Sequence, residues 1–550
     1  MKRITTIIAS LLLTSWSVAA QGFESGGVVI DPSTITAFDL FNASQSQFTF
    51  GSARSAAMAG AFTSLGGDMA SMAINPAGLG MYKKNEVTIT PLMTFGRTST
   101  SAAPFESNTS SRFALGGVGL VFKLRESERG VTAITLGLGY TRTADFNYQY
   151  SFATRGRAGG ASIADLFAGA MQSAGVSVDY LRQNYDHEGY FKWQNLDPTY
   201  WGATLGYLTG LTGSKDGVWG RDMIAPTAQP DQFATIESRG SAGEYDISLG
   251  MNINNRLYIG ATLGIPTISL QRNIYYGESY HYSSEPALDY RMDLFNYDQT
   301  ARIKGVGINF KLGVIYMPID GLRLGVAIHT PTYYSLTYKY WGGMTSDVKA
   351  LNNKDDYQLD GSDYINPPLS ERTSTLVDDG NYGWKYTTPT RLLFGASYSW
   401  RGRLTLSIDY ERDWYNGIRI KHSPYGKGLF EGYIKERFKG SNTLRVGAEW
   451  RIIPQVAVRA GYSLWSGALH NNDIVYSSPV IYRTDYAGAG VGVALSKHFT
   501  IDVAYQYYHN RMTPYKSFFA SDRNGLDIAS ATYRTTIDRH AAIVTLGVRF

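Results

Sequence analysis

From about residue 87 to the end of the chain, apolar and polar side chains alternate with a period of two. The clearest stretch is 403–414, where one phase carries Leu404, Leu406, Ile408 and Tyr410. Because successive side chains of a strand point to opposite faces, this pattern predicts strands with one apolar and one polar face. About fourteen segments show it, at 87–97, 112–124, 131–143, 243–253, 256–268, 302–317, 321–338, 387–400, 403–415, 438–451, 454–465, 485–496, 498–510 and 538–550.

The connections between these segments alternate between short and long. The long ones are 98–111, 144–242, 269–301, 339–386, 416–437, 466–484 and 511–537. Short turns at one end and long loops at the other are typical of an up-and-down transmembrane barrel with periplasmic turns and extracellular loops. A soluble sandwich has no reason to separate its loops by length. We therefore predict an all-β fold, a transmembrane antiparallel up-and-down β-barrel of about fourteen strands formed by residues 87–550.

The charged residues inside these segments lie overwhelmingly on the polar phase. They include Asp246, Lys311, Arg323, Asp409, Glu411, Arg445, Glu449, Arg459 and Asp502. An Arg or Lys that faces lipid near the midplane costs roughly 2–4 kcal/mol, so we expect the polar phase to face the lumen. The 40 tyrosines fit the aromatic girdles at the two membrane interfaces, since tyrosine has an apolar body and a polar tip.

Composition narrows the class further. Charged residues make up 18% of the 550-residue chain, below the roughly 25% of soluble domains, and glycine is enriched at 59 residues. The absence of cysteine excludes a disulfide scaffold and a cysteine-ligated metal site. A mean hydropathy of -0.20 argues against a bundle of membrane-spanning helices. The small net charge of +5 gives no reason to expect nucleic acid as a partner.

The two ends of the chain point to export. Residues 1–20 combine basic Lys2 and Arg3, a short apolar run and small residues at Ala19 and Ala20, which predicts a secretory signal peptide cut after Ala20. The alternative is an uncleaved anchor helix, but serine and threonine dilute the run. No cysteine follows, so no lipid anchor is expected there. At the other end, an amphipathic strand finishes on Phe550, which resembles the C-terminal targeting signal of bacterial outer-membrane barrels.

Residues 21–86 do not alternate, and their second half is rich in small residues. Such a sequence can form short, closely packed helices, and it is too apolar for a tail in water. We expect it inside the barrel lumen, as a hatch that plugs the pore.

The runs GSARSAAMAGAF and GGDMASMAINPAGLG, within 51–80, resemble the N-terminal hatch of the FadL/TodX family of outer-membrane transporters for long-chain fatty acids and hydrocarbons. The family's Asn-Pro-Ala motif is matched by Asn75, Pro76 and Ala77. The resemblance implies a fourteen-stranded barrel with a small hatch, a loop-built groove that collects the ligand, and exit through the barrel wall beside a kinked strand. It is specific over about residues 50–85 and covers the rest of the chain only as architecture.

The motif also has a local physical meaning. Pro76 fixes its own φ and biases Asn75 away from helix, Gly78 permits a turn, and the Asn75 side chain can hold that turn by bonding nearby backbone. Arg54 and Asp68 flank the small-residue run. We expect them to seat the hatch by bonding lumen charges such as Asp409, Glu411, Arg445 or Glu449. The alternative is an ordinary turn with a solvated charged pair.

The longest loop, 144–242, contains a stretch with helical spacing. Ile163, Leu166 and Phe167 share one apolar face there, and several aromatic residues follow. One interpretation is a loop that packs on its neighbours and caps the barrel. The other is an extracellular apolar groove in which these three residues bind a hydrophobic ligand.

We find no sequence motif for catalysis and expect no enzyme, no cofactor and no metal. The acidic residues near 355–363 lack the order of a calcium-binding loop. The leading hypothesis is passive, hatch-gated uptake of hydrophobic small molecules across the outer membrane of a Gram-negative bacterium. The alternatives are a substrate-specific porin for polar solutes and a barrel enzyme, whereas a TonB-dependent receptor would need about 22 strands. Expected partners are the hydrophobic ligand, outer-membrane lipid, lipopolysaccharide and the barrel-assembly machinery, and we expect a monomer.

Overall fold

The computed structural model describes residues 41–42, 51–101, 108–156, 160–184, 192, 196, 200–284, 286, 288–351, 359–360, 384–421, 434–469, 475–476, 479–521 and 527–550. The expected signal peptide, most of the expected hatch before residue 51, and most of the acidic stretch 355–363 lie outside these residues.

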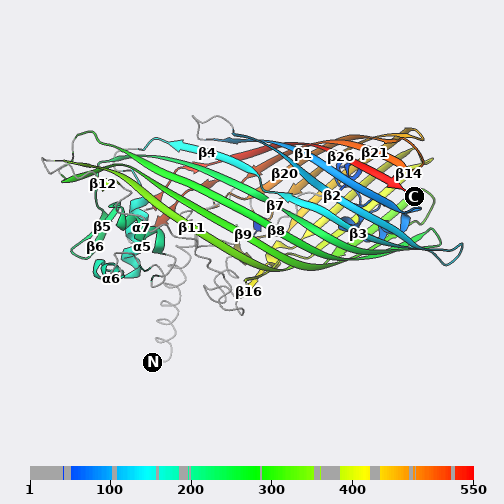
Figure 1. Cartoon of the computed structure of the whole chain (residues 1–550), viewed down its shortest axis with the longest axis horizontal. Coiled ribbons are helices and arrows are strands. Elements are labelled where there is room, and N and C mark those ends of the chain that lie inside the picture. Colours follow the sequence, from blue (N-terminus) through cyan, green and yellow to red (C-terminus); the bar gives the residue numbers. More distant parts are fainter. Residues whose placement is uncertain are drawn as a thin grey trace, which may run out of the picture.

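The period-two segments form a closed antiparallel barrel with fourteen strand positions, as predicted (Figure 1). The last strand pairs with the first, Val548 opposite Val87, so the sheet has no open edge. The strands are β1 (Glu86–Thr100), β2 (Asn108–Glu126), β3 (Val131–Asp145) with β4 (Tyr148–Thr154), β7 (Gln229–Ile253), β8 (Leu257–His281), β9 (Tyr290–Tyr316), β10 (Leu322–His329) with β11 (Tyr333–Ala350), β13 (Trp384–Thr387) with β14 (Arg391–Trp400), β15 (Leu404–Asp413) with β16 (Arg419–Lys421), β17 (Ser441–Ile453), β18 (Val456–Ser466), β20 (Ile481–Ala494), β21 (Phe499–Met512) and β26 (Thr535–Arg549).

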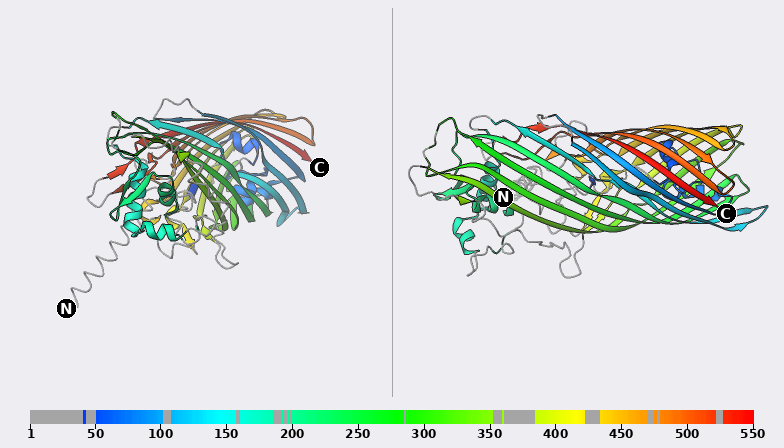
Figure 2. Two further views of the ribbon diagram at one scale, coloured as in Figure 1. Left: turned by 60° about the vertical axis from the view of Figure 1, so that its left-hand side comes forward. Right: turned by 45° about the horizontal axis from the view of Figure 1, so that its top comes forward.

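The predicted loop boundaries are wrong on one side of the barrel. Strands β7, β8, β9 and β11 run far beyond the expected ends and form a tall curved wall, which occupies much of the segments assigned to loops 144–242, 269–301 and 339–386 (Figures 1 and 2). The alternation is hidden there because the inward face of β8 carries Tyr276, Glu278 and Tyr280, so polar atoms stand on the buried side.

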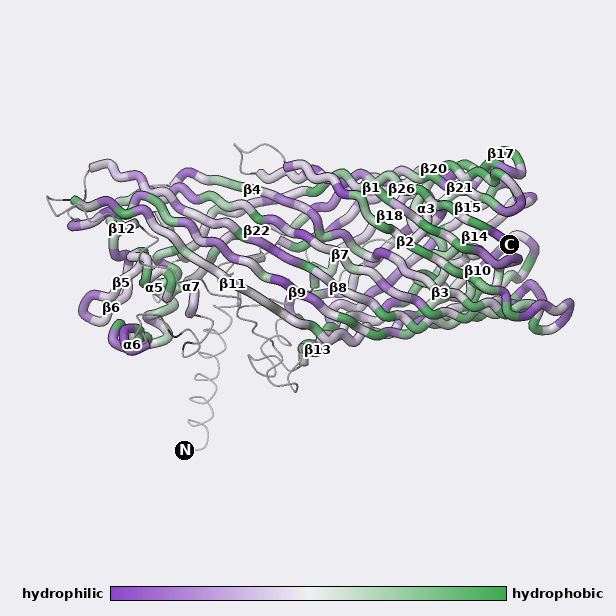
Figure 3. Tube along the Cα trace, in the orientation of Figure 1, coloured by the Kyte–Doolittle hydropathy of each residue, from purple (hydrophilic) through white to green (hydrophobic). Residues whose placement is uncertain are grey.

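We call the half of the barrel that holds the short turns its lower half, and the outer face of this half is apolar. The charged residues that the sequence predicts in the lumen do face the lumen. Figure 3 shows the hydrophobic colour gathered towards the end where the chain finishes. Exposed aromatic residues mark two levels of this band. Near the short turns they are Tyr316, Trp400, Trp450, Phe499 and Phe550, and nearer the loops they are Tyr245, Tyr333, Tyr410, Trp414, Tyr462 and Tyr505. This arrangement is the one that a bilayer requires of a barrel wall.

The girdles explain only part of the tyrosine enrichment. Among the largest fully buried side chains are Tyr150, Tyr276, Tyr297, Tyr386, Tyr508, Tyr515 and Tyr533. Most of them belong to a core that lies above the membrane band, between the tall wall and the loops. The interpretation of tyrosine as a girdle residue is therefore too broad.

The segment 51–85 lies inside the barrel, in the half that holds the short turns (Figure 1). It contains α3 (Ala53–Ala57), α4 (Ser71–Ile74) and the 3-10 helix η1 (Pro76–Met81). Almost every residue from 51 to 80 is buried. Small side chains permit this, because three short helices must fit within a ring of strands. We call this segment the hatch.

The loops at the opposite end fold into a cap. It contains α5 (Ile163–Ala174), α6 (Val178–Gln183), α7 (Trp201–Leu208) and the hairpin β5 (Thr212–Lys215) and β6 (Val218–Arg221) (Figure 2). Ser162 and Asp165 form a capping box at the start of α5, and Gly175 ends it in the left-handed conformation. Of the helices in the described part of the chain, none has the length and apolarity needed to cross a membrane.

The remaining short elements lie in the loops. They are β12 (Leu359–Asp360), η4 (Tyr415–Gly417), β19 (Val475–Tyr476), β22 (Tyr515–Lys516), β23 (Phe519–Ser521), β24 (Asp527–Ala529) and β25 (Thr532–Tyr533).

Candidate functional site: the hatch and the cavity above it

The Asn-Pro-Ala motif connects two parts of the hatch and the wall. Asn75 is fully buried, and its Nδ2 donates to the Thr63 carbonyl at 2.7 Å, while its Oδ1 accepts from the Ala77 N–H at 3.1 Å. Pro76 occupies the first position of η1, where its missing N–H costs nothing. The same Nδ2 lies 3.4 Å from the carbonyls of Val314 and Val326 in the wall. The side chain therefore joins a turn, a neighbouring hatch segment and two barrel strands.

Ionic contacts join the other end of the hatch to the wall. Arg54 Nε donates to Glu449 Oε2 at 2.8 Å, and Arg459 Nε donates to the same oxygen at 2.8 Å. Arg459 Nη1 also reaches Asp502 at 2.5 Å. The Glu449 side chain is almost completely buried, so one carboxylate holds two guanidinium groups inside the lumen.

The other expected seating residues divide. Asp409 Oδ2 accepts from the Thr63 N–H of the hatch at 2.7 Å. Asp68 accepts from the Ala70 N–H within the hatch at 2.9 Å and forms no ion pair among the described residues. Glu411 and Arg445 pair with each other above the hatch instead of with it. That Arg54 and Asp68 hold the hatch in place through these lumen charges remains a prediction.

Backbone groups of the hatch also bond to wall side chains that sequence reasoning missed. His329 Nε2 lies 2.9 Å from the Ile74 carbonyl, Tyr486 OH donates to the Ala56 carbonyl at 2.6 Å, and Thr262 Oγ1 donates to the Met72 carbonyl at 3.1 Å. All three lie on the inward phase of their strands. The sequence pattern predicts that these side chains face the lumen, but it does not predict which hatch group each of them bonds.

Glycines on the inward phase make room for the hatch. In the ladders, Gly260 pairs with both Gly250 and Gly313, and Gly461 pairs with both Gly447 and Gly488. A Cβ atom at Gly260 would overlap with the Pro76 backbone, and one at Gly461 would overlap with the backbone of Met58. Part of the glycine enrichment is thus explained by close approach of backbone to backbone.

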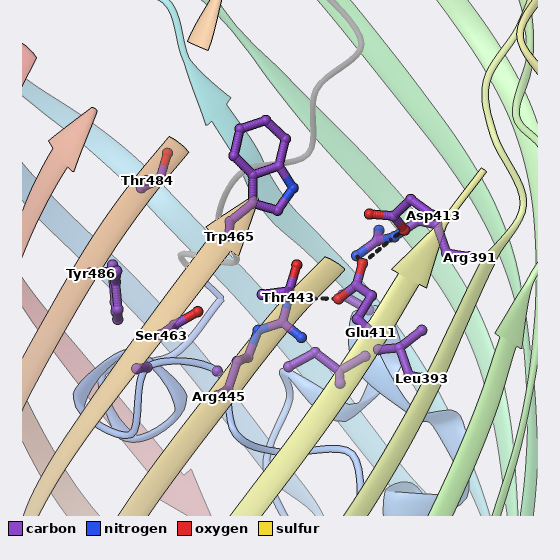
Figure 4. Close-up of a pocket in the computed structure, with 14 residues that line it drawn as sticks. Arg391, Leu393, Glu411, Asp413, Thr443, Arg445, Ser463, Trp465, Thr484 and Tyr486 are labelled. Atoms are coloured by element: carbon purple, nitrogen blue, oxygen red, sulfur yellow. Dashed lines mark hydrogen bonds and ion pairs between the residues drawn. The ribbon is translucent and has the colours of Figure 1, made fainter. Parts of the chain in front are cut away.

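A cavity lies directly above the hatch (Figure 4). It has an empty volume of about 740 Å³, part of it open to solvent, and its floor includes Ala59, Gly60, Ala73 and Ile74 of the hatch. The hatch thus closes the lower side of a space that the barrel wall surrounds.

The two sides of the cavity differ in character. On one side, Glu411 accepts from Arg391 Nε at 2.7 Å and from Arg445 Nη2 at 2.5 Å. On the other side, Trp465 and Tyr486 contribute aromatic surface, as Figure 4 shows. A space with an aromatic side and a fixed charged side fits an amphiphilic solute.

The three residues expected to bind ligand lie in the cap. Ile163, Leu166 and Phe167 of α5 are buried in its core, and the Phe167 ring meets Tyr297 of the tall wall edge-on at 6.3 Å. The geometry matches a loop that packs on its neighbours. A solute could touch these side chains only if α5 moved, so their role in binding remains a prediction.

A buried carboxylate anchors α5 to the tall wall. Glu278 of β8 accepts hydrogen bonds from Ser162 Oγ at 2.5 Å, the Ile163 N–H at 2.9 Å, Tyr276 OH at 2.6 Å and Tyr280 OH at 2.8 Å. These donors satisfy the carboxylate without a cation. Burial raises the pKa of the Glu278 carboxyl, although the donors act against this rise.

This anchor predicts a pH-dependent cap. Because its pKa is raised, the Glu278 carboxyl binds its proton more tightly in the folded cap than in the unfolded chain. The stability of the cap is therefore fully present below the ordinary carboxyl pKa and falls as pH rises through the raised pKa. We expect the protection factors of the α5 amides, which are corrected for the base catalysis of intrinsic exchange, to fall with rising pH in the wild type and to be independent of pH in Glu278→Gln. Glu278→Ala should leave several buried donors unpaired, at about 1–3 kcal/mol each, and should expose α5 to protease. Wild-type protection factors that do not change with pH would contradict this assignment.

The C-terminal residue and the possible metal ligands are the remaining sites considered from the sequence. Phe550 is exposed on the outer face, and its N–H donates to the Asn85 carbonyl at 3.1 Å. Its role as a targeting signal remains a prediction. Within the described residues, no group of three or more His, Asp or Glu side chains could hold a metal ion.

Comparison with known proteins gives structural likeness at low identity. No protein-family model and no curated protein matches the chain. A FadL homologue of Pseudomonas aeruginosa is 13% identical, over 92% of this chain and 99% of that one, with a TM-score of 0.49. The toluene transporter TodX of Pseudomonas putida is 12% identical, over 91% and 98%, with a TM-score of 0.45. The toluene transporter TbuX of Ralstonia pickettii is 15% identical, over 93% and 100%, with a TM-score of 0.46.

Proposed function

We propose that this protein is an outer-membrane transporter that takes up hydrophobic small molecules by passive, hatch-gated diffusion. The class of solute is the one that the hatch resemblance implies, and the similar solved structures include the toluene transporters TodX and TbuX. The proposal places the protein in the outer membrane of a Gram-negative bacterium, with the short turns in the periplasm and the cap outside the cell.

The observation that carries the proposal is the closed hatch. Met58, Phe62 and Leu79 are completely buried in the lumen, and the wall glycines leave no space between hatch and barrel at the points described above. A porin for polar solutes needs a continuous water-filled path, and packed apolar side chains across the lumen oppose one.

The cavity suggests how a solute waits at the hatch. An apolar body can lie against Trp465, Tyr486 and Ile74, while a polar end can reach Arg391 or Arg445. Passage then requires the hatch to shift, which breaks the contacts of Asn75 and of Arg54. The energy of those contacts sets how rarely the unliganded protein opens.

The test uses Asn75. Asn75→Ala removes the donor to Thr63 and leaves buried carbonyls unpaired, at about 1–3 kcal/mol, so we expect hatch opening to become roughly tenfold or more frequent. Ion conductance in a planar bilayer and entry of a radiolabelled fatty acid into proteoliposomes should both rise. Pro76→Gly should act in the same direction by loosening the turn.

The matched control is Asn416→Ala, since Asn416 is exposed in η4 outside the hatch. If Asn75→Ala and Pro76→Gly leave the uptake of every apolar solute unchanged while the barrel assembles normally, hatch gating is wrong.

A further inference from the structure

A cluster of basic side chains lies on the outer face of the barrel directly above the apolar band, on β9 of the tall wall and on the neighbouring strands β13 and β16. The cluster consists of Arg302 and Lys304 on β9, Lys385 on β13 and Arg419 on β16, all exposed. We call it the outer basic patch.

Strand register places these residues together. Ser335 of β11 lies between Val306 of β9 and Lys385 of β13, and Lys304 is one outward position above Val306. In the pairing of β13 with β16, Arg419 lies opposite Thr387, which is the next outward-facing residue after Lys385 along β13. With about 4.8 Å between adjacent strands and about 3.3 Å between residues along a strand, neighbouring members of the patch lie roughly 7–12 Å apart, and its two ends, Arg302 and Arg419, lie roughly 25 Å apart. Long basic side chains bridge the distances between neighbouring members.

The patch lacks acidic partners. Among the described residues, none of its four members forms an ion pair, and the nearby Glu237 pairs with Arg239 at 3.1 Å. The guanidinium of Arg302 is held along the wall by the Gln271 Oε1 atom, at 2.6 Å from Nη2. A held guanidinium still offers further donors for a bidentate contact.

The opposite side of the barrel is different. There, outward-facing Arg483 pairs with Asp485 at 2.8 Å, and His509 pairs with Asp538 at 2.7 Å. The outer surface on that side therefore combines acidic and basic groups that contact each other, whereas the members of the outer basic patch form no ion pair among the described residues.

An apolar strip lies directly below the patch. Val306, Ile308 and Tyr333 on the same outward face are more than half exposed. A ligand that matches both features has negatively charged groups at the upper membrane boundary and acyl chains below them. Arginine and lysine favour phosphate groups in this geometry.

We propose that the outer basic patch binds the phosphate groups of lipopolysaccharide, with the acyl chains lying on the strip formed by Val306, Ile308 and Tyr333. The leaflet follows from the loops, because β13 and β16, which carry Lys385 and Arg419, continue β14 and β15 on the side of the long loops and the cap. Bound lipid would fix the tall wall, and with it the cap, relative to the membrane surface.

The test measures binding of bisphosphorylated lipid A to the full-length protein in uncharged detergent, by native mass spectrometry and by competition with a fluorescent lipid A. The variant is Arg302→Ser, Lys304→Ser, Lys385→Ser and Arg419→Ser combined. We expect at least a tenfold loss of affinity, and weaker wild-type binding in higher salt.

The control is Arg483→Ser combined with Arg511→Ser, on the opposite side of the barrel, which should stay within threefold of the wild type. Circular dichroism and thermal unfolding establish that both proteins fold. Unchanged affinity of the fourfold variant, equal binding of dephosphorylated lipid A, equal binding of phosphatidylglycerol or an equal loss in the control would each overturn the proposal. No transport solute enters the experiment, so its outcome is independent of the proposed uptake.

Discussion

Gly260→Ala is expected to unseat the hatch while the barrel still forms. Gly260 faces the lumen, and an added Cβ atom would overlap with the carbonyl group of Pro76 and the nitrogen of Ala77. These are backbone atoms, so no side-chain rotation can relieve the overlap. Forced overpacking costs about 1–3 kcal/mol. If this overlap destabilises the closed position of the hatch by that amount, opening should become roughly ten- to hundredfold more frequent, since about 1.4 kcal/mol corresponds to a factor of ten in an equilibrium constant.

The measurement is single-channel conductance in a planar bilayer, where the variant should show frequent openings that the wild type lacks. Gly343→Ala is the matched control, because Gly343 is also a strand glycine and a Cβ atom there would meet nothing within 4 Å. Equal conductance of the two variants would show that η1 does not depend on the close approach at Gly260.

Glu449→Ala is expected to give the largest loss of stability. The variant leaves Arg54 without its carboxylate partner, while Arg459 keeps Asp502. Breaking a buried pair by removing one partner costs about 3–5 kcal/mol, mostly because the remaining charge stays buried without compensation. We expect the free energy of unfolding, measured by urea titration in lipid vesicles, to fall by about that amount.

Two controls separate this explanation from a general effect of mutation. Arg451 also approaches Glu449, at 3.6 Å, but its side chain is 55% exposed, so Arg451→Ala should cost less than about 1 kcal/mol. Adding Arg54→Met to Glu449→Ala should recover part of the loss, since it removes the unpaired charge. A double variant that is less stable than Glu449→Ala alone would contradict the account.

The barrel could be predicted because its physics repeats along the chain. In 403–414, for example, Leu406, Ile408 and Tyr410 are exposed on the outer face, and Asp409 and Glu411 are buried in the lumen. A lipid exterior and a polar interior impose the same period on each strand, so a local pattern is enough. Asn75 and Pro76 were also readable, since their turn is local in sequence.

The cap and the seat of the hatch could not be predicted in the same way, because they depend on distant partners. Glu278 and Ser162 are separated by 116 residues, and nothing near either residue indicates the other. The alternation in β8 fails where polar Glu278 and the tyrosines share its buried face. The glycines at 250, 260 and 313 lie on the inward phase, but only the register of three strands shows that they face the hatch.

The central claim is that a closed hatch admits apolar solutes and excludes polar ones. The most direct measurement compares two fluxes through the same purified protein in proteoliposomes, entry of a radiolabelled long-chain fatty acid and steady ion conductance. The account predicts fatty acid entry well above that of protein-free vesicles, with negligible steady conductance, and a rise in conductance in Gly260→Ala. A large, steady conductance in the wild type, with fatty acid entry no faster than in protein-free vesicles, would contradict it and would favour a porin for polar solutes.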